Sequence, residues 1–172
     1  KAKDARSYMN AREQAVRERI KILFPNYNWT FDHTIPHHTR VIGKRFRPDA
    51  RATFGDRVII VEIDEDSHRY YMCALERARE ESFVVSFISK TVVMIRFNPD
   101  EYTDLNGKHH PSCFTRPTPV ERKVQVHKKQ KVQWEHRIKT LQNAIAYILD
   151  PDNELPPKQE DRPLLTLELF YD

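Results

Sequence analysis

The chain has 172 residues, of which 39% are hydrophobic and 31% are charged. This length and composition are typical of one globular domain, so we expect a single domain over residues 1–172. No apolar run approaches the roughly 18 residues that a membrane-spanning helix needs, and the net charge of +4 is only a weak preference for anionic partners.

The first predicted element is a helix over residues 5–24. Its apolar residues recur at helical spacing among Arg and Glu side chains, and Pro25 ends the pattern. In the following segment Trp29 and Phe31 alternate, which is typical of a short strand before a loop.

A β-hairpin is predicted next. The segments 45–54 and 57–64 flank Gly55-Asp56, and Gly at the first central position favours a two-residue turn of type II′. With such a turn the numbers of every opposed pair of residues sum to 111. Asp49 therefore faces Glu62 across the predicted hairpin.

The elements after the hairpin are predicted from periodicity and from turn residues. They are a helix with an apolar stripe from Tyr71 to Val85, a buried strand over 91–97, a loop over 98–119, a basic helix over 120–150, a loop over 151–163, and a last strand or extended arm over 164–170. The order αβββαβ, followed by a long helix and a terminal strand or arm, predicts an α/β fold.

The pair formed by Asp49 and Glu62 is a candidate metal site. Cross-strand neighbours have Cβ atoms about 5 Å apart, and two unshielded carboxylates at that separation destabilise a sheet. A cation such as Mg²⁺ compensates the charge, since it takes one or two carboxylates and completes its shell with water and phosphate. Alternate residues share a face, so Asp64 can serve the same site as Glu62.

These acidic residues are also explained without a metal ion. The hairpin register places Arg47 opposite Asp64, and Arg51 lies nearby, so the acidic strand ends can simply form surface ion pairs that contribute little to stability. Pro48 cannot donate to a ladder, and it can shift the pairing.

Three further residues are candidates by position. His68 follows the acidic run and is placed to act as a general base or acid, or it is only a helix-entry histidine. Arg79 lies three residues after Glu76, which is also the spacing of an intrahelical ion pair. Lys90 begins the strand over 91–97.

These motifs resemble the restriction-endonuclease-like, PD-(D/E)XK superfamily. Arg-Pro-Asp at 47–49 and Val-Glu-Ile-Asp at 61–64 stand where the superfamily motif is expected. The longer run 61–68 with Glu76 and Arg79, the segment 95–100 and the closing Leu-Phe-Tyr-Asp at 169–172 resemble endonuclease-like proteins of giant DNA viruses and eukaryotes. The resemblance implies an αβββαβ core with a mixed central sheet.

One position departs from the superfamily pattern. The superfamily has Lys two residues after the Glu, and this chain has Asp64 there. Either another cation replaces the lysine, or Asp64 holds a second metal ion. The pattern in this chain is similar to that of very short patch repair endonucleases, in which the lysine is absent and His and Asp residues act in catalysis. This similarity makes His68 a candidate catalytic residue.

The resemblance implies a catalytic set of Asp49, Glu62, Asp64, His68 and a glutamate of the first helix, Glu13. It implies Mg²⁺ or Mn²⁺ on Asp49, Glu62 and Asp64, with nucleic acid as the substrate. The candidate nucleic-acid contacts are Arg47, Arg51, Arg79, Lys90, Arg96, Lys128, Lys129 and Lys131. For Arg96, and for the neighbouring Asn98, a phosphate contact and a plain turn remain alternatives.

The first functional hypothesis is therefore a metal-dependent endonuclease, with DNA as the expected substrate, RNA left open and a homodimer allowed. The second is a nucleic-acid-binding module with weak or lost catalysis, which docks through the basic segment 121–139 of net charge +5. That segment is otherwise a solvated helix face. A zinc site at His109, His110 and Cys113, with Cys73, is a minor third interpretation.

The expected location is intracellular, nuclear or cytoplasmic. Two cysteines without a CxxC pair are typical of a reducing compartment. The chain starts without Met or an apolar signal, and we expect it to be a piece of a longer protein. The resemblance leaves a virus or a mobile element open as its source.

Overall fold

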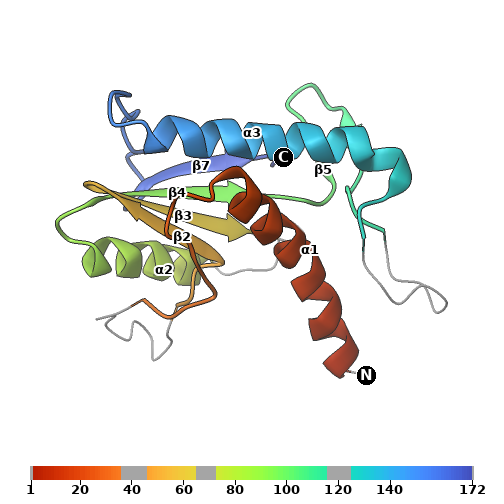
Figure 1. Ribbon diagram of the computed structural model, residues 1–172, viewed down its shortest axis with the longest axis horizontal. Coiled ribbons are helices and arrows are strands. Elements are labelled where there is room, and N and C mark those ends of the chain that lie inside the picture. The colour runs from red at the N-terminus through yellow and green to blue at the C-terminus, as the bar shows by residue number, and fades with distance from the viewer. Residues whose placement is uncertain (1, 36–45, 65–72, 116–124, 172) are drawn as a thin grey trace.

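The computed structural model describes residues 2–35, 46–64, 73–115 and 125–171. In this part of the chain, five strands form one mixed sheet, two short strands form a second one, and three α-helices pack around the larger sheet (Figure 1). The elements are α1 (Ala2–Leu23), β1 (Thr30–Phe31), β2 (Ala50–Phe54), β3 (Arg57–Ile63), α2 (Cys73–Ser86), β4 (Thr91–Phe97), β5 (Tyr102–Thr103), β6 (His109–His110), the 3₁₀ turn η2 (Lys128–Gln130), α3 (Lys131–Leu149) and β7 (Leu165–Leu169).

The hairpin of β2 and β3 has the predicted register. Ala50 pairs with Val61 and Phe54 with Arg57, so opposed residue numbers sum to 111. Gly55 has φ +54°, which a residue without a Cβ adopts at little cost in the first position of a type II′ turn. The ladder starts at Ala50 rather than at residue 45, because Pro48 has no N–H to donate.

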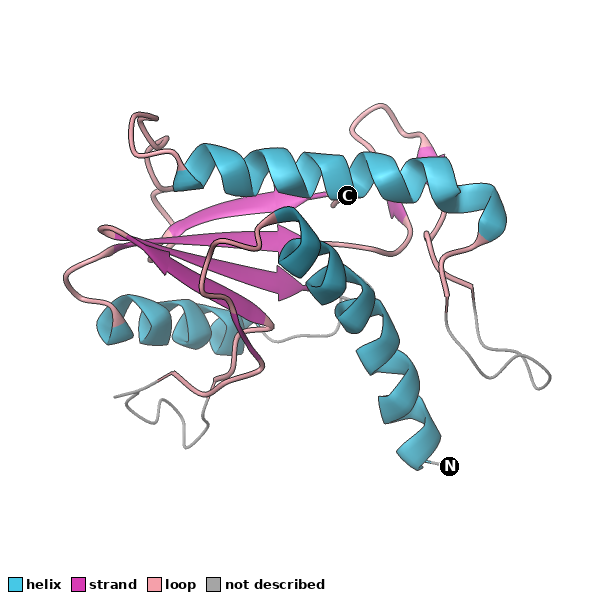
Figure 2. Ribbon diagram, in the orientation of Figure 1, coloured by secondary structure: helices cyan, strands magenta, loops and turns pink. Residues whose placement is uncertain are grey.

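The large sheet has the strand order β1-β2-β3-β4-β7. β1, β2 and β3 run antiparallel, whereas β3, β4 and β7 run parallel. The parallel connection from β3 to β4 carries α2, and the one from β4 to β7 carries α3, as such crossovers require (Figure 2). The terminal segment is thus a strand, which decides between the two alternatives for it.

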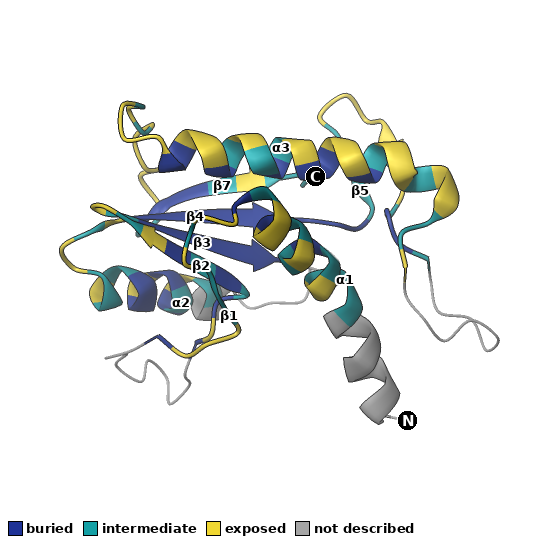
Figure 3. Cartoon of the chain, viewed as in Figure 1, coloured by how far each residue is buried: buried dark blue, intermediate teal, exposed yellow. Residues whose placement is uncertain are grey.

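Each face of the sheet has its own core. On one face, Ile59, Val61 and Ile63 of β3 pack with residues of α1 and α3, and on the other Val58 and Ile60 pack with Phe83 of α2. The central strands β3 and β4 are buried except for their first residues (Figure 3). Glu62 and Asp64 follow the alternation, so they lie on the α2 face.

The apolar stripe predicted for α2 is partly wrong. Ala78 and Ser82 face the sheet, but Val85 is 57% exposed and Phe83 is fully buried in its place. The helix ends at Ser86, so Val85 belongs to its last turn, where the side chain is open to solvent. Tyr71 lies outside the described residues.

Two predicted boundaries in the second half of the chain are also wrong. The segment 98–119 contains the small sheet of β5 and β6, with residues 116–119 outside the described part. The basic helix begins at Lys131 rather than at residue 120, since Val126 bridges to Phe114 and His127 caps the η2 turn by accepting from the N–H of Lys129. The apolar stripe of α3 from Trp134 to Ile148 is buried as predicted.

Within the described residues, no helix combines the length and the apolar character that crossing a membrane requires.

Candidate active site

Three predicted site residues meet at one end of the hairpin. Asp49 lies in the bend just before β2, Glu62 is in β3, and Asp64 directly follows β3. Oδ2 of Asp49 accepts a hydrogen bond of 2.7 Å from the N–H of Ile63, which fixes this carboxylate next to Glu62. The hairpin register and this backbone bond together bring the three carboxylates close to one another.

Glu62 is the most deeply buried member of the proposed metal pair. Its side chain is 3% exposed, and Oε2 forms an ion pair with Nη2 of Arg79 from α2. Burial raises the pKa of Glu62 well above its usual value, the positive charge of Arg79 opposes that rise, and Asp49 and Asp64 add to it. Oε1 of Glu62 is buried and has no hydrogen-bond partner among the described residues.

Asp49 is more open to solvent, with a side chain that is 23% exposed. Burial still raises its pKa, against the lowering effects of the Ile63 N–H and of the charges on Arg79 and Arg17. Arg17 of α1 places Nη2 4.0 Å from Oδ1 of Asp49. This contact is long for an ion pair, so the outer oxygen of Asp49 is only weakly engaged.

Asp64 is held differently. Its carboxylate is fully buried, and Oδ2 accepts from Nε of Arg96 at 2.5 Å and from the hydroxyl of Tyr171. Burial, together with the negative charge of Asp64, raises the pKa of Tyr171, which keeps this hydroxyl a donor. Sequence reasoning does not single out Tyr171, although it stands in the closing Leu-Phe-Tyr-Asp motif.

Glu76 and Arg79 of α2 reach different strands, although their spacing also fits an intrahelical pair. Glu76 lies 3.5 Å from Nη2 of Arg96 in β4, whereas Arg79 contacts Glu62 in β3. The cluster of Asp49, Glu62, Asp64 and Glu76 is therefore lined by two arginines, Arg79 and Arg96.

The cluster brings together four carboxyl groups and two arginines, Arg79 and Arg96. A third arginine, Arg17, pairs with Glu13 and lies near Asp49. Among the described residues, no group of three or more His, Cys, Asp or Glu side chains is arranged to hold a metal ion. A pair of carboxylates with water and phosphate is, however, a usual set of ligands for Mg²⁺.

Glu13, the predicted contribution of the first helix, approaches the site indirectly. It forms an ion pair with Arg17, and Arg17 in turn lies near Asp49. The helix therefore reaches the cluster through an arginine, which sequence reasoning does not select. His68 lies outside the described residues.

The predicted nucleic-acid contacts on the sheet are dispersed. Arg47 is exposed and lies 3.5 Å from Asp32, whereas the predicted register places it against Asp64; Arg96 occupies that position. Arg51 donates to Thr30 and stacks over the ring of Phe87, with a guanidinium pKa lowered by burial.

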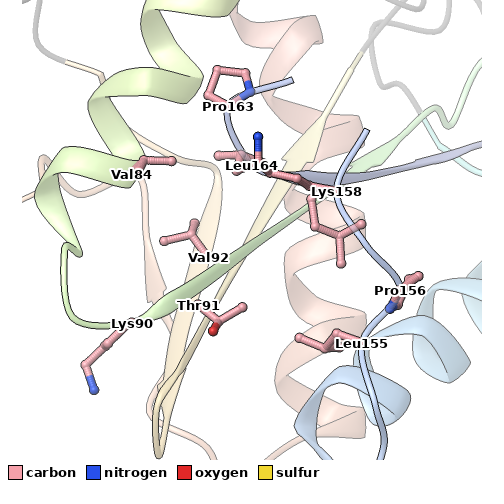
Figure 4. A pocket seen from close by; sticks show the side chains of 10 residues that line it. Val84, Lys90, Thr91, Val92, Leu155, Pro156, Lys158, Pro163 and Leu164 are labelled. Carbon is pink, nitrogen blue, oxygen red and sulfur yellow. The ribbon is translucent and has the colours of Figure 1, made fainter. Parts of the chain in front are cut away.

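Lys90 lies at the opposite end of the sheet from the cluster. Its ammonium donates to the carbonyl of Gly55 in the hairpin turn. Because β3 has seven residues, this position is roughly 20 Å from the cluster. Lys90 instead lines a cavity of 310 Å³ between β4, α2 and residues 155–165, shown in Figure 4.

The basic segment before α3 divides into two environments. Lys128, Lys129 and Lys131 are exposed in η2 and in the first turn of α3. The net charge of +5 predicted for a docking face includes Arg137, but this residue is fully buried and donates to backbone carbonyls. The basic surface is therefore smaller than the sequence predicts.

Asn98 is held as part of a turn. Its Oδ1 accepts from the N–H of Asp100, and its Nδ2 donates to the carbonyl of Phe170. Arg96 is 7% exposed and engaged with Asp64 and Glu76. In this state of the protein both residues serve the framework of the site.

One histidine and the cysteine of the zinc interpretation also have other environments. The ring of His110 lies 2.9 Å from Asp104 and is stacked on Tyr102. Burial raises the pKa of Cys113 to about 11, so this thiol is protonated at neutral pH.

No protein-family model matches this sequence, and a search of curated proteins returns no match.

Proposed function

We propose that this chain is a metal-dependent nuclease with the restriction-endonuclease-like, PD-(D/E)XK fold. The order of the first six elements, α1 to β4, supports the proposal, because it is the αβββαβ order of that core. The strand directions support it as well: an antiparallel hairpin, β2 and β3, leads through α2 into a strand parallel to β3.

The observation that carries the proposal is the pair of carboxylates at the end of the hairpin. Asp49 and Glu62 lie side by side, one of them fixed by the N–H of Ile63 and the other with a buried oxygen that has no partner in the described part. These two residues would hold Mg²⁺ or Mn²⁺. The bound cation would lower the pKa of a water molecule and offset negative charge on a phosphodiester.

Neighbouring groups hold this pair in the structure described. Arg79 pairs with Glu62, and the Ile63 N–H orients Asp49. We assign Asp64 to a positioning role, because Arg96 and Tyr171 engage the same oxygen of its carboxylate.

Cleavage of labelled DNA, offered as single-stranded, duplex and branched substrates with Mg²⁺ or Mn²⁺, tests the proposal. Asp49→Asn and Glu62→Gln keep the side-chain shape and remove the charge, and we expect each to lower the cleavage rate about a hundredfold or more. Glu18→Gln is the matched control, since Glu18 is exposed on α1 and paired with Lys21. Cleavage that survives both changes would rule out this site.

The second candidate is a nucleic-acid-binding module without cleavage. It is favoured by Asp64, which stands where a lysine is expected and is buried against Arg96. Binding of DNA without cleavage of any substrate, with either metal, would establish this alternative.

A further inference from the structure

Arg79 is the cation most directly placed on the proposed metal site. It extends from α2 to the sheet and pairs with Glu62, which is its only ion-pair partner among the described residues. Arg96 is held by more partners, because it forms ion pairs with Asp64, Glu76 and Glu168. Of the two arginines that line the cluster, Arg79 is the one that a single change at Glu62 would release.

The guanidinium of Arg79 also has donors to spare. An arginine has five N–H donors, and the hydrogen bond to Glu62 uses only one nitrogen. Its Nε is buried and makes no hydrogen bond within the described part of the chain. The flat guanidinium fork matches the oxygens of a phosphate group, to which arginine binds bidentately.

A metal ion and Arg79 would compete for the same carboxylate. Glu62 is 3% exposed at its side chain, so two cations on it would repel each other in a poorly solvated site. Asp49, the other proposed ligand, is 23% exposed, so the open side of the site lies toward it. Arg79 is itself 15% exposed, so its side chain is not sealed in the core.

We propose that Arg79 is a tethered cation that occupies Glu62 until a divalent metal displaces it, and that the released guanidinium then binds the scissile phosphate of the nucleic acid. This inference rests on the proposed function, since it needs a metal at Asp49 and Glu62. It assigns to Arg79 the phosphate contact of the lysine that Asp64 replaces.

The intact wild-type chain gives the most direct test. Phenylglyoxal modifies accessible arginines, and tandem mass spectrometry locates the modification. We expect Mn²⁺ to raise the rate at which phenylglyoxal modifies Arg79 severalfold. The reason is that Arg79 would leave its ion pair with Glu62 and become accessible to solvent. Arg77 is the internal control on the same helix, exposed and paired with Glu81, and its rate should not change.

Calorimetry with the same metal ions distinguishes a failure of the displacement from a failure of the metal site. If calorimetry shows that Mn²⁺ binds and Arg79 is no more reactive, the displacement is wrong while the metal site stands. If calorimetry shows no binding of Mn²⁺ or Mg²⁺, the metal site itself is wrong, and the inference is overturned with it.

Substitution of Arg79 supplies a second test, in which metal affinity should rise while the cleavage rate should fall. Arg79→Gln should bind Mn²⁺ about tenfold more tightly if Arg79 blocks the site nine-tenths of the time. It should also cleave about a hundredfold more slowly, since a neutral amide cannot pair with the phosphate charge. Weaker metal binding together with slower cleavage would show a purely structural arginine and overturn the inference.

Arg79→Lys keeps the proposal testable if the Gln variant does not fold. The retained charge should leave Mn²⁺ affinity near that of wild type, and the absence of the fork should still slow cleavage about tenfold. Equal cleavage by Arg79→Lys and wild type would contradict the phosphate contact. Arg77→Gln should match wild type in both readouts.

Discussion

Arginines from three elements surround the buried carboxylates of the cluster. Arg17 comes from α1, Arg79 from α2 and Arg96 from β4. A buried ion pair contributes little net stability, but removal of one partner leaves a charge that water cannot solvate. Removal of one charged residue of the site should therefore cost more stability than removal of one residue from an ion pair on the surface.

Glu80 shows the same dependence outside the cluster and allows a prediction for pH. It is 1% exposed, pairs with Arg162 at 2.6 Å, and has a pKa raised above its usual 4.5 by burial. Arg162→Gln should raise this pKa further and lower the free energy of unfolding at pH 7 by about 2 to 3 kcal/mol.

The sign of the pH effect follows from linkage. A carboxyl whose pKa is higher in the folded state than in the unfolded state stabilises the folded state when it is protonated. This contribution to the free energy of unfolding is fully present below the pKa of the unfolded state, and it is lost as the pH rises through the pKa of the folded state. The deficit of Arg162→Gln should therefore shrink as pH falls toward 4.5. Urea unfolding at several pH values measures it, with Arg77→Gln as control, and a deficit that is constant with pH would contradict the assignment to Glu80.

At the scale of elements, one buried side chain of α3 forms several hydrogen bonds to the segment after β4. Arg137 donates to the carbonyls of Asn98, Asp100 and Pro111, at 3.0, 2.6 and 3.1 Å. Its guanidinium also lies over the rings of Tyr102 and Phe170. One buried arginine thus joins α3, the small sheet and the end of β7.

Arg137→Lys should lower the free energy of unfolding by about 2 to 4 kcal/mol, because an ammonium cannot reach three carbonyls in the geometry of the fork. Urea denaturation measures this difference. Lys139→Gln, on the exposed side of the same helix, should change it by less than about 0.5 kcal/mol. A mild effect of Arg137→Lys would show that the carbonyls find other donors.

At the scale of the whole molecule, η2 and the start of α3 lie on the side toward which β3 and β4 point (Figure 1). Lys128, Lys129 and Lys131 are exposed there. Lys90 and Lys158 line the cavity at the other end of the sheet. If nucleic acid binds at the acidic cluster, the first set is the one on the same side of the molecule (Figure 1).

Replacement of Lys128, Lys129 and Lys131 by Gln should weaken binding to duplex DNA. It should also flatten the salt dependence by about 0.9 in the logarithmic slope for each phosphate that a lysine no longer neutralises. Fluorescence anisotropy over a salt series, without divalent metal, measures both. The double change of Lys90 and Lys158 to Gln is the matched control. A stronger effect of the control would place the binding face at the other end.

Much of the fold was predictable because its signals are local. Pro25 and Pro151 limit helices, Gly55 supplies the turn, and the run 91–97 has the bounds of β4. The hairpin register then followed from the turn length alone, and the alternation along the strand put Glu62 and Asp64 on one face. The boundary of α3 was not predictable in this way, because the bridge between Val126 and Phe114 joins segments that no local pattern relates.

For the candidate site, the sequence by itself determined the hairpin register from Ala50 to the turn, since a two-residue turn fixes the opposed pairs. That Asp49, which lies just before this ladder, faces Glu62 was a prediction by extension of the same register. Only the tertiary structure decided which side chains engage the carboxyl groups of the site: Arg79 pairs with Glu62, whereas Arg96 and Tyr171 engage Asp64. Arg79, Arg96 and Tyr171 come from three other parts of the chain, and the packing of α2 and the end of β7 on the sheet brings them there. Charge and burial at that meeting point depend on groups distant in sequence, which no local pattern contains.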